Sequence, residues 1–153
     1  MDQLTRILVI DDDKTIRLTM AAILRAEGYT VDTAETGKEA IEKSYANNYN
    51  VALIDIKLPD IMGTELLDKL KPTDPPMIKI IVTGFPALEN AIEAVNRGAN
   101  AYILKPANPQ KLLQTVKSWL QKQKEAVPTN QLKVADARAR ITVAWSFKDD
   151  KQT

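Results

Sequence analysis

The sequence contains no cysteine and no histidine among its 153 residues. Without cysteine the chain can form no disulfide and use no thiol chemistry. Without histidine it cannot build the usual catalytic triads or cysteine–histidine pairs, and most zinc sites are excluded as well. Any chemistry that the chain performs must therefore use carboxylates, lysine, threonine and a hard metal ion.

A strong charge imbalance and a long apolar run are also lacking. The 21 Lys and Arg residues nearly balance the 20 Asp and Glu residues, and the net charge of +1 argues against a strongly basic nucleic-acid-binding protein. No apolar run approaches the roughly 20 residues that cross a membrane. The N-terminus carries acids where a signal peptide has basic residues. We therefore expect a cytoplasmic chain that does not contact a membrane.

Strand-like and helix-like segments alternate over the first 126 residues. Short apolar runs such as residues 51–55 are typical of buried parallel strands, whereas Ile16, Met20 and Ile23 recur at helical spacing. The predicted strands cover residues 6–11, 30–34, 51–55, 77–83 and 101–104, and the predicted helices cover residues 14–28, 37–48, 64–71, 86–98 and 108–126.

This alternation predicts an α/β fold with a doubly wound, five-stranded parallel sheet and helices on both faces. The strand order 2-1-3-4-5 suits five such units. We expect one domain over residues 1–124. Residues 125–153 are too short for a core of their own, so we interpret them as a C-terminal tail or the start of a linker or effector region.

Reactive side chains stand at the carboxyl ends of four of the predicted strands. Because the carboxyl ends of the strands form the functional edge of a doubly wound sheet, we expect these side chains to share one pocket. Carboxylates about 4 Å apart repel by roughly 4 kcal/mol per pair at an effective dielectric near 20, and a divalent cation removes that cost. Oxygen ligands favour Mg²⁺. The residues concerned are Asp11, Asp12, Asp13, Asp55, Thr83 and Lys105.

Such a pocket suits phosphoryl transfer, in which positioning and charge neutralisation do most of the work. Lys105 offers a compact positive charge beside a phosphoryl group, and the Thr83 hydroxyl can donate to a phosphoryl oxygen. Asp55 is the natural nucleophile, because a carboxylate can accept a phosphoryl group as an acyl phosphate.

Four spaced motifs now identify a family. The stretches ILVIDDDKTIR, VALIDIKLPDIMG, IIVTGF and AYILKPA together resemble the receiver domain of two-component response regulators, the CheY-like domain, over residues 5 to about 122. The resemblance implies the flavodoxin-like sheet order 2-1-3-4-5, for which receivers are a known example. It also implies a phosphoacceptor switch rather than an enzyme, with only self-catalysed phosphoryl transfer and autodephosphorylation.

The resemblance implies a role for each motif position. Asp11 and Asp12 match the acidic pair that holds Mg²⁺, and Asp55 matches the phosphoacceptor. The backbone carbonyl of Lys57 would complete the metal shell. Thr83 and Lys105 match the residues that contact the phosphoryl group, and Tyr102 matches the aromatic switch residue. The Lys105–Pro106 peptide is expected to be cis. Lys57 and Phe85 occupy positions that tune the lifetime of the phosphoryl group. Because Phe85 cannot orient water by hydrogen bonding, we expect slow self-dephosphorylation.

The implied partners are a sensor histidine kinase, which donates the phosphoryl group, and an unknown downstream protein or effector domain. Phosphorylation is expected to reshape the face formed by residues 86–98, 101–104 and 108–126. Apolar residues at near-heptad spacing in the last helix also allow a phosphorylation-dependent homodimer. Direct DNA binding by this chain is not expected.

Other interpretations stay open at this point. Read as D-x-D-x-T, residues 11–15 resemble the nucleophile motif of haloacid-dehalogenase-like phosphatases, with Asp11 as nucleophile and Asp13 as acid/base. That reading gives Asp55 no role and lacks a paired-acid motif after Lys105. A flavodoxin-like electron carrier needs a hydroxyl-rich and glycine-rich phosphate loop, where this chain has three aspartates. Taken singly, Asp13 could cap a helix and Tyr102 could be a core residue.

Overall fold

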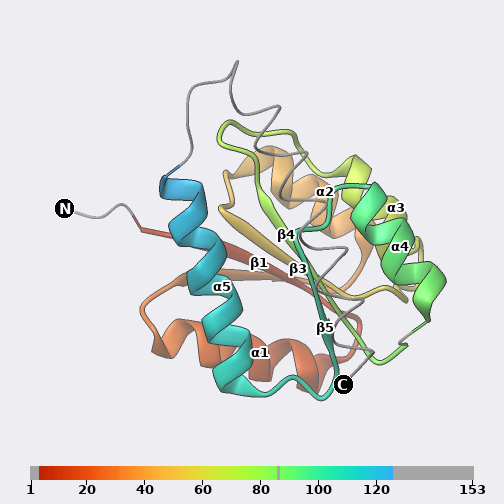
Figure 1. Cartoon of the computed structure of the whole chain (residues 1–153), viewed down its shortest axis with the longest axis horizontal. Coiled ribbons are helices and arrows are strands. Elements are labelled where there is room, and N and C mark those ends of the chain that lie inside the picture. Colours follow the sequence, from red (N-terminus) through yellow and green to blue (C-terminus); the bar gives the residue numbers. More distant parts are fainter. Residues whose placement is uncertain (1–3, 86, 126–153) are drawn as a thin grey trace.

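The computed structural model describes residues 4–85 and 87–125, and within them strands and helices alternate as predicted (Figure 1). Residues 126–153, most of the expected C-terminal extension, and Pro86, the expected start of the fourth helix, lie outside the described residues. The strands are β1 Arg6–Ile10, β2 Thr30–Ala34, β3 Val51–Ile54, β4 Ile78–Thr83 and β5 Ala101–Leu104, and the helices are α1 Lys14–Ala26, α2 Gly37–Ala46, α3 Gly63–Lys69, α4 Leu88–Asn96 and α5 Pro109–Lys124.

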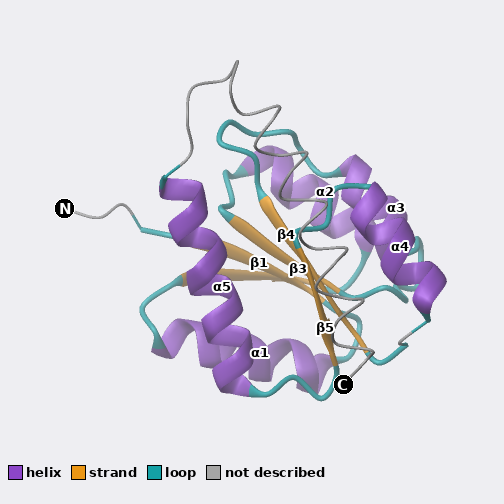
Figure 2. Cartoon of the chain, in the orientation of Figure 1, coloured by secondary structure: helices purple, strands orange, loops and turns teal. Residues whose placement is uncertain are grey.

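The five strands form one parallel sheet in the order β2-β1-β3-β4-β5, which confirms the predicted fold class. Helices α1 and α5 lie on one face of the sheet, and α2, α3 and α4 lie on the other (Figures 1 and 2). Ile10 of β1 is in register with Ile54 of β3, so the carboxyl ends of these two central strands lie side by side. The loops that follow them therefore open onto the same edge.

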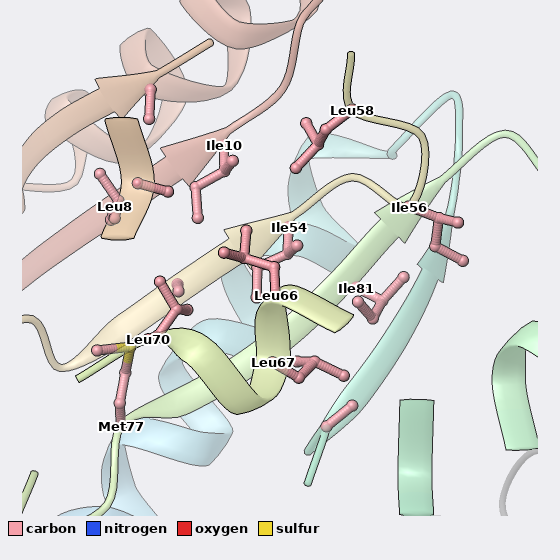
Figure 3. Packing of buried hydrophobic residues seen from close by; sticks show 14 of the residues in the cluster. Leu8, Ile10, Ile54, Ile56, Leu58, Leu66, Leu67, Leu70, Met77 and Ile81 are labelled. Atoms are coloured by element: carbon pink, nitrogen blue, oxygen red, sulfur yellow. The ribbon is translucent and has the colours of Figure 1, made fainter. Parts of the chain in front are cut away.

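Each face of the sheet buries its own apolar cluster. Along β1, Leu8 and Ile10 face the cluster under α2, α3 and α4, whereas Ile7 and Val9 face the cluster under α1 and α5. Figure 3 shows the leucines of α3 packed over the first of these clusters. Fully burying one such side chain contributes about 1.5–3 kcal/mol, so the two clusters hold the central strands firmly in place.

Helix ends differ from the prediction by about two residues, for an identifiable reason. The expected helices over 14–28 and 86–98 end at Ala26 and Asn96, because Gly28 and Gly98 adopt left-handed φ angles of 97° and 98° that end a helix. At the other end of α1, the Asp13 side chain accepts from the Ile16 N–H at 3.0 Å, so Asp13 is a helix cap. None of the helices in the described part of the chain is long and apolar enough to span a membrane.

Candidate functional site

Three site residues stand one position beyond their strands, yet the sheet still holds their backbones. The predicted strands over 6–11 and 51–55 end one residue earlier than expected, at Ile10 and Ile54. Even so, the Asp55 N–H donates to the Ile10 carbonyl at 3.0 Å, and the Lys105 N–H donates to the Thr83 carbonyl at 2.8 Å. The Asp11 N–H likewise donates to the carbonyl of Ala34 at 3.1 Å. The sheet thus fixes where these side chains start.

The sequence-predicted acids come together at this edge. Carboxylate oxygens of Asp11, Asp12 and Asp55 lie within 4.8 Å of one another. Asp11 and Asp55 are buried, with exposed fractions of 0% and 6%, while Asp12 is exposed. Lys105 closes the group, because its Nζ lies 2.6 Å from Asp11 Oδ2 and 3.4 Å from Asp55 Oδ2. Three acids therefore face a single lysine.

One oxygen of this cluster lacks a partner. Within residues 4–85 and 87–125, Asp55 Oδ1 is buried and accepts no hydrogen bond. Leaving a buried acceptor unpaired costs about 1–3 kcal/mol, and more for a charged group. A hard divalent cation bound by carboxylate oxygens would satisfy this atom and offset the repulsion among the acids, so the residues present fit a magnesium site.

The cluster also perturbs the protonation of its members. Burial and the neighbouring Asp11 charge raise the pKa of Asp55 above its usual value, although Lys105 opposes the shift. Burial disfavours the charge of Lys105, but its hydrogen bond to Asp11 and the charges of Asp11 and Asp55 outweigh this effect, so the pKa of Lys105 is raised. Lys105 therefore stays cationic at neutral pH, while the ionised form of Asp55 is disfavoured and a bound cation would stabilise it.

Thr83 and Tyr102 are linked through the residue between them in space, Phe85. The buried Thr83 Oγ accepts from the Phe85 N–H at 3.1 Å, and the Tyr102 hydroxyl donates to the Phe85 carbonyl at 3.1 Å. Tyr102 also packs against the apolar cluster under α4, and burial raises its pKa. The Lys105–Pro106 peptide is cis.

Lys57 and Phe85 lie at the exposed rim of the site. Lys57 follows β3 by three residues and Phe85 follows β4 by two, so each belongs to a loop at the carboxyl edge. The Lys57 Nζ sits 3.9 Å from the centroid of the Phe85 ring, which is a cation–π contact between the two loops.

Three residues support the site that the sequence argument did not single out. Gly63 allows α3 to approach Asp55, since a Cβ at this position would lie 2.1 Å from the Asp55 carbonyl oxygen. Asp60 anchors the same loop, because its carboxylate accepts from two backbone amides at the start of α2, at 2.9 and 2.8 Å. The buried Arg17 donates to the Asp11 carbonyl at 2.9 Å and pairs with Glu35 at 3.1 Å.

Some of these could have been found from sequence. Asp60 and Gly63 stand in a loop with Pro59, where a turn acid and a glycine carry meaning. Their contact partners, however, depend on how that loop lies against α2 and Asp55. Arg17 sits one turn after Asp13, but nothing in its spacing indicates that it bonds the backbone of Asp11.

Comparisons with known proteins agree with this geometry. The family model described as "Response regulator receiver domain" matches residues 7–117. The transcriptional regulatory protein ResD of Bacillus subtilis is 34% identical over 125 residues, which are 80% of this chain and 51% of that protein. This chain thus spans about half the length of ResD.

Solved structures show the same likeness. A response regulator receiver domain protein (CheY-like) from Methanospirillum hungatei is 47% identical with a TM-score of 0.77, over 80% of this chain and 98% of that one. A response regulator protein from Burkholderia pseudomallei, solved with a phosphorylated aspartic acid and a calcium ion, is 31% identical with a TM-score of 0.67, over 78% of this chain and 72% of that one.

Proposed function

Because the chain belongs to the response regulator receiver domain family, we propose that it is the phosphoacceptor switch of a two-component phosphorelay, with Asp55 as acceptor. The observation that carries this proposal is the buried Asp55, with one unpaired oxygen, beside Asp11, Asp12 and Lys105. The phosphorylated aspartic acid in the Burkholderia pseudomallei structure supports it.

The phosphoryl group is proposed to come from a sensor histidine kinase, since this chain has no histidine of its own. A carboxylate oxygen of Asp55 attacks the phosphorus of the phosphohistidine in line. The new P–O bond forms as the P–N bond breaks, and the bonding electrons return to the imidazole of the kinase. The chain acts as a signalling domain and catalyses only its own phosphorylation and dephosphorylation.

Asp11, Asp12, Asp55 and the backbone carbonyl of Lys57 are the proposed ligands of Mg²⁺. The bound ion would neutralise charge on the carboxylates and on the phosphoryl oxygens. Lys105 already contacts Asp55 Oδ2 at 3.4 Å, so its ammonium is placed to stabilise the phosphoryl group as well.

Phosphorylation is proposed to switch the face formed by α4, β5 and α5. Thr83 Oγ turns to the phosphoryl group, and Tyr102 turns inward into the space that Thr83 leaves. A new local charge thereby biases a two-state element. Leu88 and Ile92 of α4 and Leu104 of β5 are about half exposed, at 52%, 52% and 51%, which supports docking of a downstream protein or a second copy on this face.

Further parts of the proposal concern lifetime and domain limits. Phe85 offers no hydrogen-bonding side chain for an attacking water, so with Lys57 it should give slow self-dephosphorylation, and Phe85→Asn should shorten the phosphoryl lifetime. Residues 1–124 form the receiver domain, and residues 125–153 form a tail or the start of a linker or effector region. We place the chain in the cytoplasm, without direct DNA binding.

The proposal is tested by intact-mass analysis after incubation with acetyl phosphate and Mg²⁺. We expect one added phosphoryl group in the wild-type chain, and none in Asp55→Asn or in the presence of a metal chelator. The matched control Asp60→Asn changes an acid five residues away in the same loop and should keep the adduct. Loss of the adduct in the control alone would show that a different carboxylate is the acceptor.

A further inference from the structure

We propose that the contact between Lys57 and Phe85 is a clasp that holds the switch in its resting state. The inference rests on the proposed function, because it names what opposes the change at the same site. The ammonium of Lys57 lies 3.9 Å from the centroid of the Phe85 ring and joins the loop after β3 to the loop after β4. The proposed phosphoacceptor Asp55 begins the first of these loops, and Thr83, which carries the switch hydroxyl, is the last residue of β4 before the second.

The backbone of Phe85 is bonded to both side chains that are proposed to move. Its N–H donates to Thr83 Oγ at 3.1 Å, and its carbonyl accepts from the Tyr102 hydroxyl at 3.1 Å. Thr83 must give up the first bond to reach a phosphoryl group, and Tyr102 must give up the second to turn inward. Whatever fixes Phe85 in place therefore favours the resting positions of both.

The Phe85 ring is not packed in either apolar cluster of the described residues, so its contact with Lys57 is the main restraint on the ring that we consider. The side chain is 47% exposed, and of the residues that the structure describes, neither apolar cluster includes it. Gly84 adds room, because a Cβ there would find its nearest neighbour, Lys105 Cβ, only at 4.0 Å. The Phe85 carbonyl also accepts from the Ala87 N–H at 2.9 Å, so the backbone of Phe85 is held by hydrogen bonds and its ring is held by the contact with Lys57.

Lys57 has a competing partner once the site is charged. It lies only two residues beyond Asp55, so a phosphoryl group on Asp55 attracts the same ammonium that rests on the ring. An exposed cation–π contact is worth about two- to fivefold in an equilibrium constant. The clasp thus lowers the equilibrium constant for activation about two- to fivefold. The phosphoryl group on Asp55 removes this opposition when it draws Lys57 away from the Phe85 ring.

A titration with beryllofluoride, a mimic of the phosphoryl group, tests the clasp in the full chain. The affinity is measured at fixed Be²⁺ and Mg²⁺ from the backbone amide signal of Gly84. We expect Phe85→Leu to bind about two- to fivefold more tightly than the wild type, because Lys57 is released. Phe85→Tyr keeps an aromatic ring and should match the wild type. In a Lys57→Met background, Phe85→Leu should change the affinity no further.

The background comparison matters because Lys57→Met alone removes both the clasp and an attraction for the anion. Lys111→Met, on the exposed side of α5, controls for the loss of one positive charge. An equal effect of Phe85→Leu with and without Lys57 overturns the clasp. Failure of the wild-type chain to bind beryllofluoride overturns the proposed function instead.

A measurement without any ligand tests the clasp independently. In the resting protein, Lys57→Met should speed hydrogen exchange of the Phe85 N–H, which bonds Thr83, by about two- to fivefold. Lys111→Met should leave this rate unchanged. If the Phe85 N–H exchanges equally fast in both variants and the wild type, Lys57 does not hold the loop.

Discussion

The two ends of the sheet treat their polar side chains in opposite ways. At the amino end, neutral amides satisfy one another: Asn50 Oδ1 accepts from the Arg6 N–H at 3.0 Å, and Asn50 Nδ2 donates to Gln123 Oε1 at 3.2 Å. Gln123 Nε2 in turn donates to the Pro76 carbonyl at 3.0 Å. At the carboxyl end, three acids meet one lysine, and Asp55 Oδ1 has no partner among the described residues.

The polar contacts at the amino end of the sheet stabilise the fold, whereas those at the carboxyl end lower its stability. Amide side chains donate and accept at once and carry no charge, so they tie α5 to the start of β3 at any pH. The carboxyl end retains like-charge repulsion and an unpaired acceptor, which only a cation can relieve. Strain of this kind is tolerated at functional sites when the surrounding fold over-determines the geometry.

The largest effect is expected where α3 meets the acidic edge. Gly63→Ala places a Cβ 2.1 Å from the Asp55 carbonyl oxygen and 2.9 Å from Ile56 Cα, and both neighbours are backbone. We expect the free energy of unfolding to fall by about 3 kcal/mol, since backbone must shift to make room. Chemical denaturation measures this fall. Gly84→Ala meets nothing closer than 4.0 Å and should cost less than about 1 kcal/mol. Equal costs at the two glycines would contradict the crowding argument.

Bound magnesium should relieve the charge repulsion at the carboxyl end of the sheet and so stabilise the folded protein. At 100 times its dissociation constant, a ligand that binds only the folded state adds about 2.7 kcal/mol to the free energy of unfolding. Thermal unfolding should show this gain in the wild type and in Asn50→Ala, but much less of it in Asp55→Asn. An equal gain in Asp55→Asn would remove Asp55 from the metal site.

Magnesium affinity should also depend on pH. Burial and the charge of Asp11 raise the pKa of Asp55 above its usual value of 3.8, so as pH falls the affinity should begin to drop at a higher pH than it would for a carboxylate with the usual pKa.

A substitution at the amino end of the sheet should lower stability without changing the phosphorylation chemistry. Asn50→Ala removes the side-chain acceptor of the Arg6 N–H and the donor to Gln123 Oε1, which costs about 1–3 kcal/mol. We expect lower stability in urea denaturation, while the rate of phosphorylation by acetyl phosphate stays within about twofold of the wild type. A large loss of phosphorylation under conditions where Asn50→Ala is still folded would show that the amino and carboxyl ends of the sheet are coupled.

The smallest effects should have opposite signs at two acids of one loop. Burial and Asp11 raise the pKa of Asp55, so its folded form holds the proton more tightly than the unfolded chain, and stability rises as pH falls from the folded pKa towards 3.8. The Gly37 and Lys38 amides lower the pKa of Asp60, so its contribution is present above 3.8 and is lost as pH falls through the folded pKa.

At neutral pH without metal, Asp55→Asn should therefore raise the free energy of unfolding, and Asp60→Asn should lower it. We expect changes of about 1 kcal/mol or less in each case, measured by chemical denaturation. Changes of the same sign would mean that the acidic cluster is not under electrostatic strain.

The fold followed from sequence because its signals are local and repeated. Apolar runs, helical spacing and terminal residues such as Asp13 and Gly28 specify each unit, and right-handed crossovers leave few ways to join the units. The errors lie at the ends: the predicted helices over 14–28 and 86–98 were two residues too long, because a left-handed glycine ends a helix before the glycine itself.

The acidic site was only partly accessible from sequence. Parallel strands deliver their following residues to one edge, so the grouping of Asp11, Asp12, Asp55 and Lys105 could be predicted. The supporting contacts of Asp60 and Gly63 could not, since they depend on the path of the loop after β3. The contact of Lys57 with Phe85 joins two such loops and is set by both paths together.

The most direct test of the account is to find which carboxylate takes the phosphoryl group. The wild-type chain is incubated with acetyl phosphate and Mg²⁺, the acyl phosphate is reduced with borohydride to homoserine, and the peptides are sequenced by mass spectrometry. We expect homoserine at position 55 alone. Homoserine at position 11, the nucleophile of a haloacid-dehalogenase-like phosphatase, or at position 60 would contradict it.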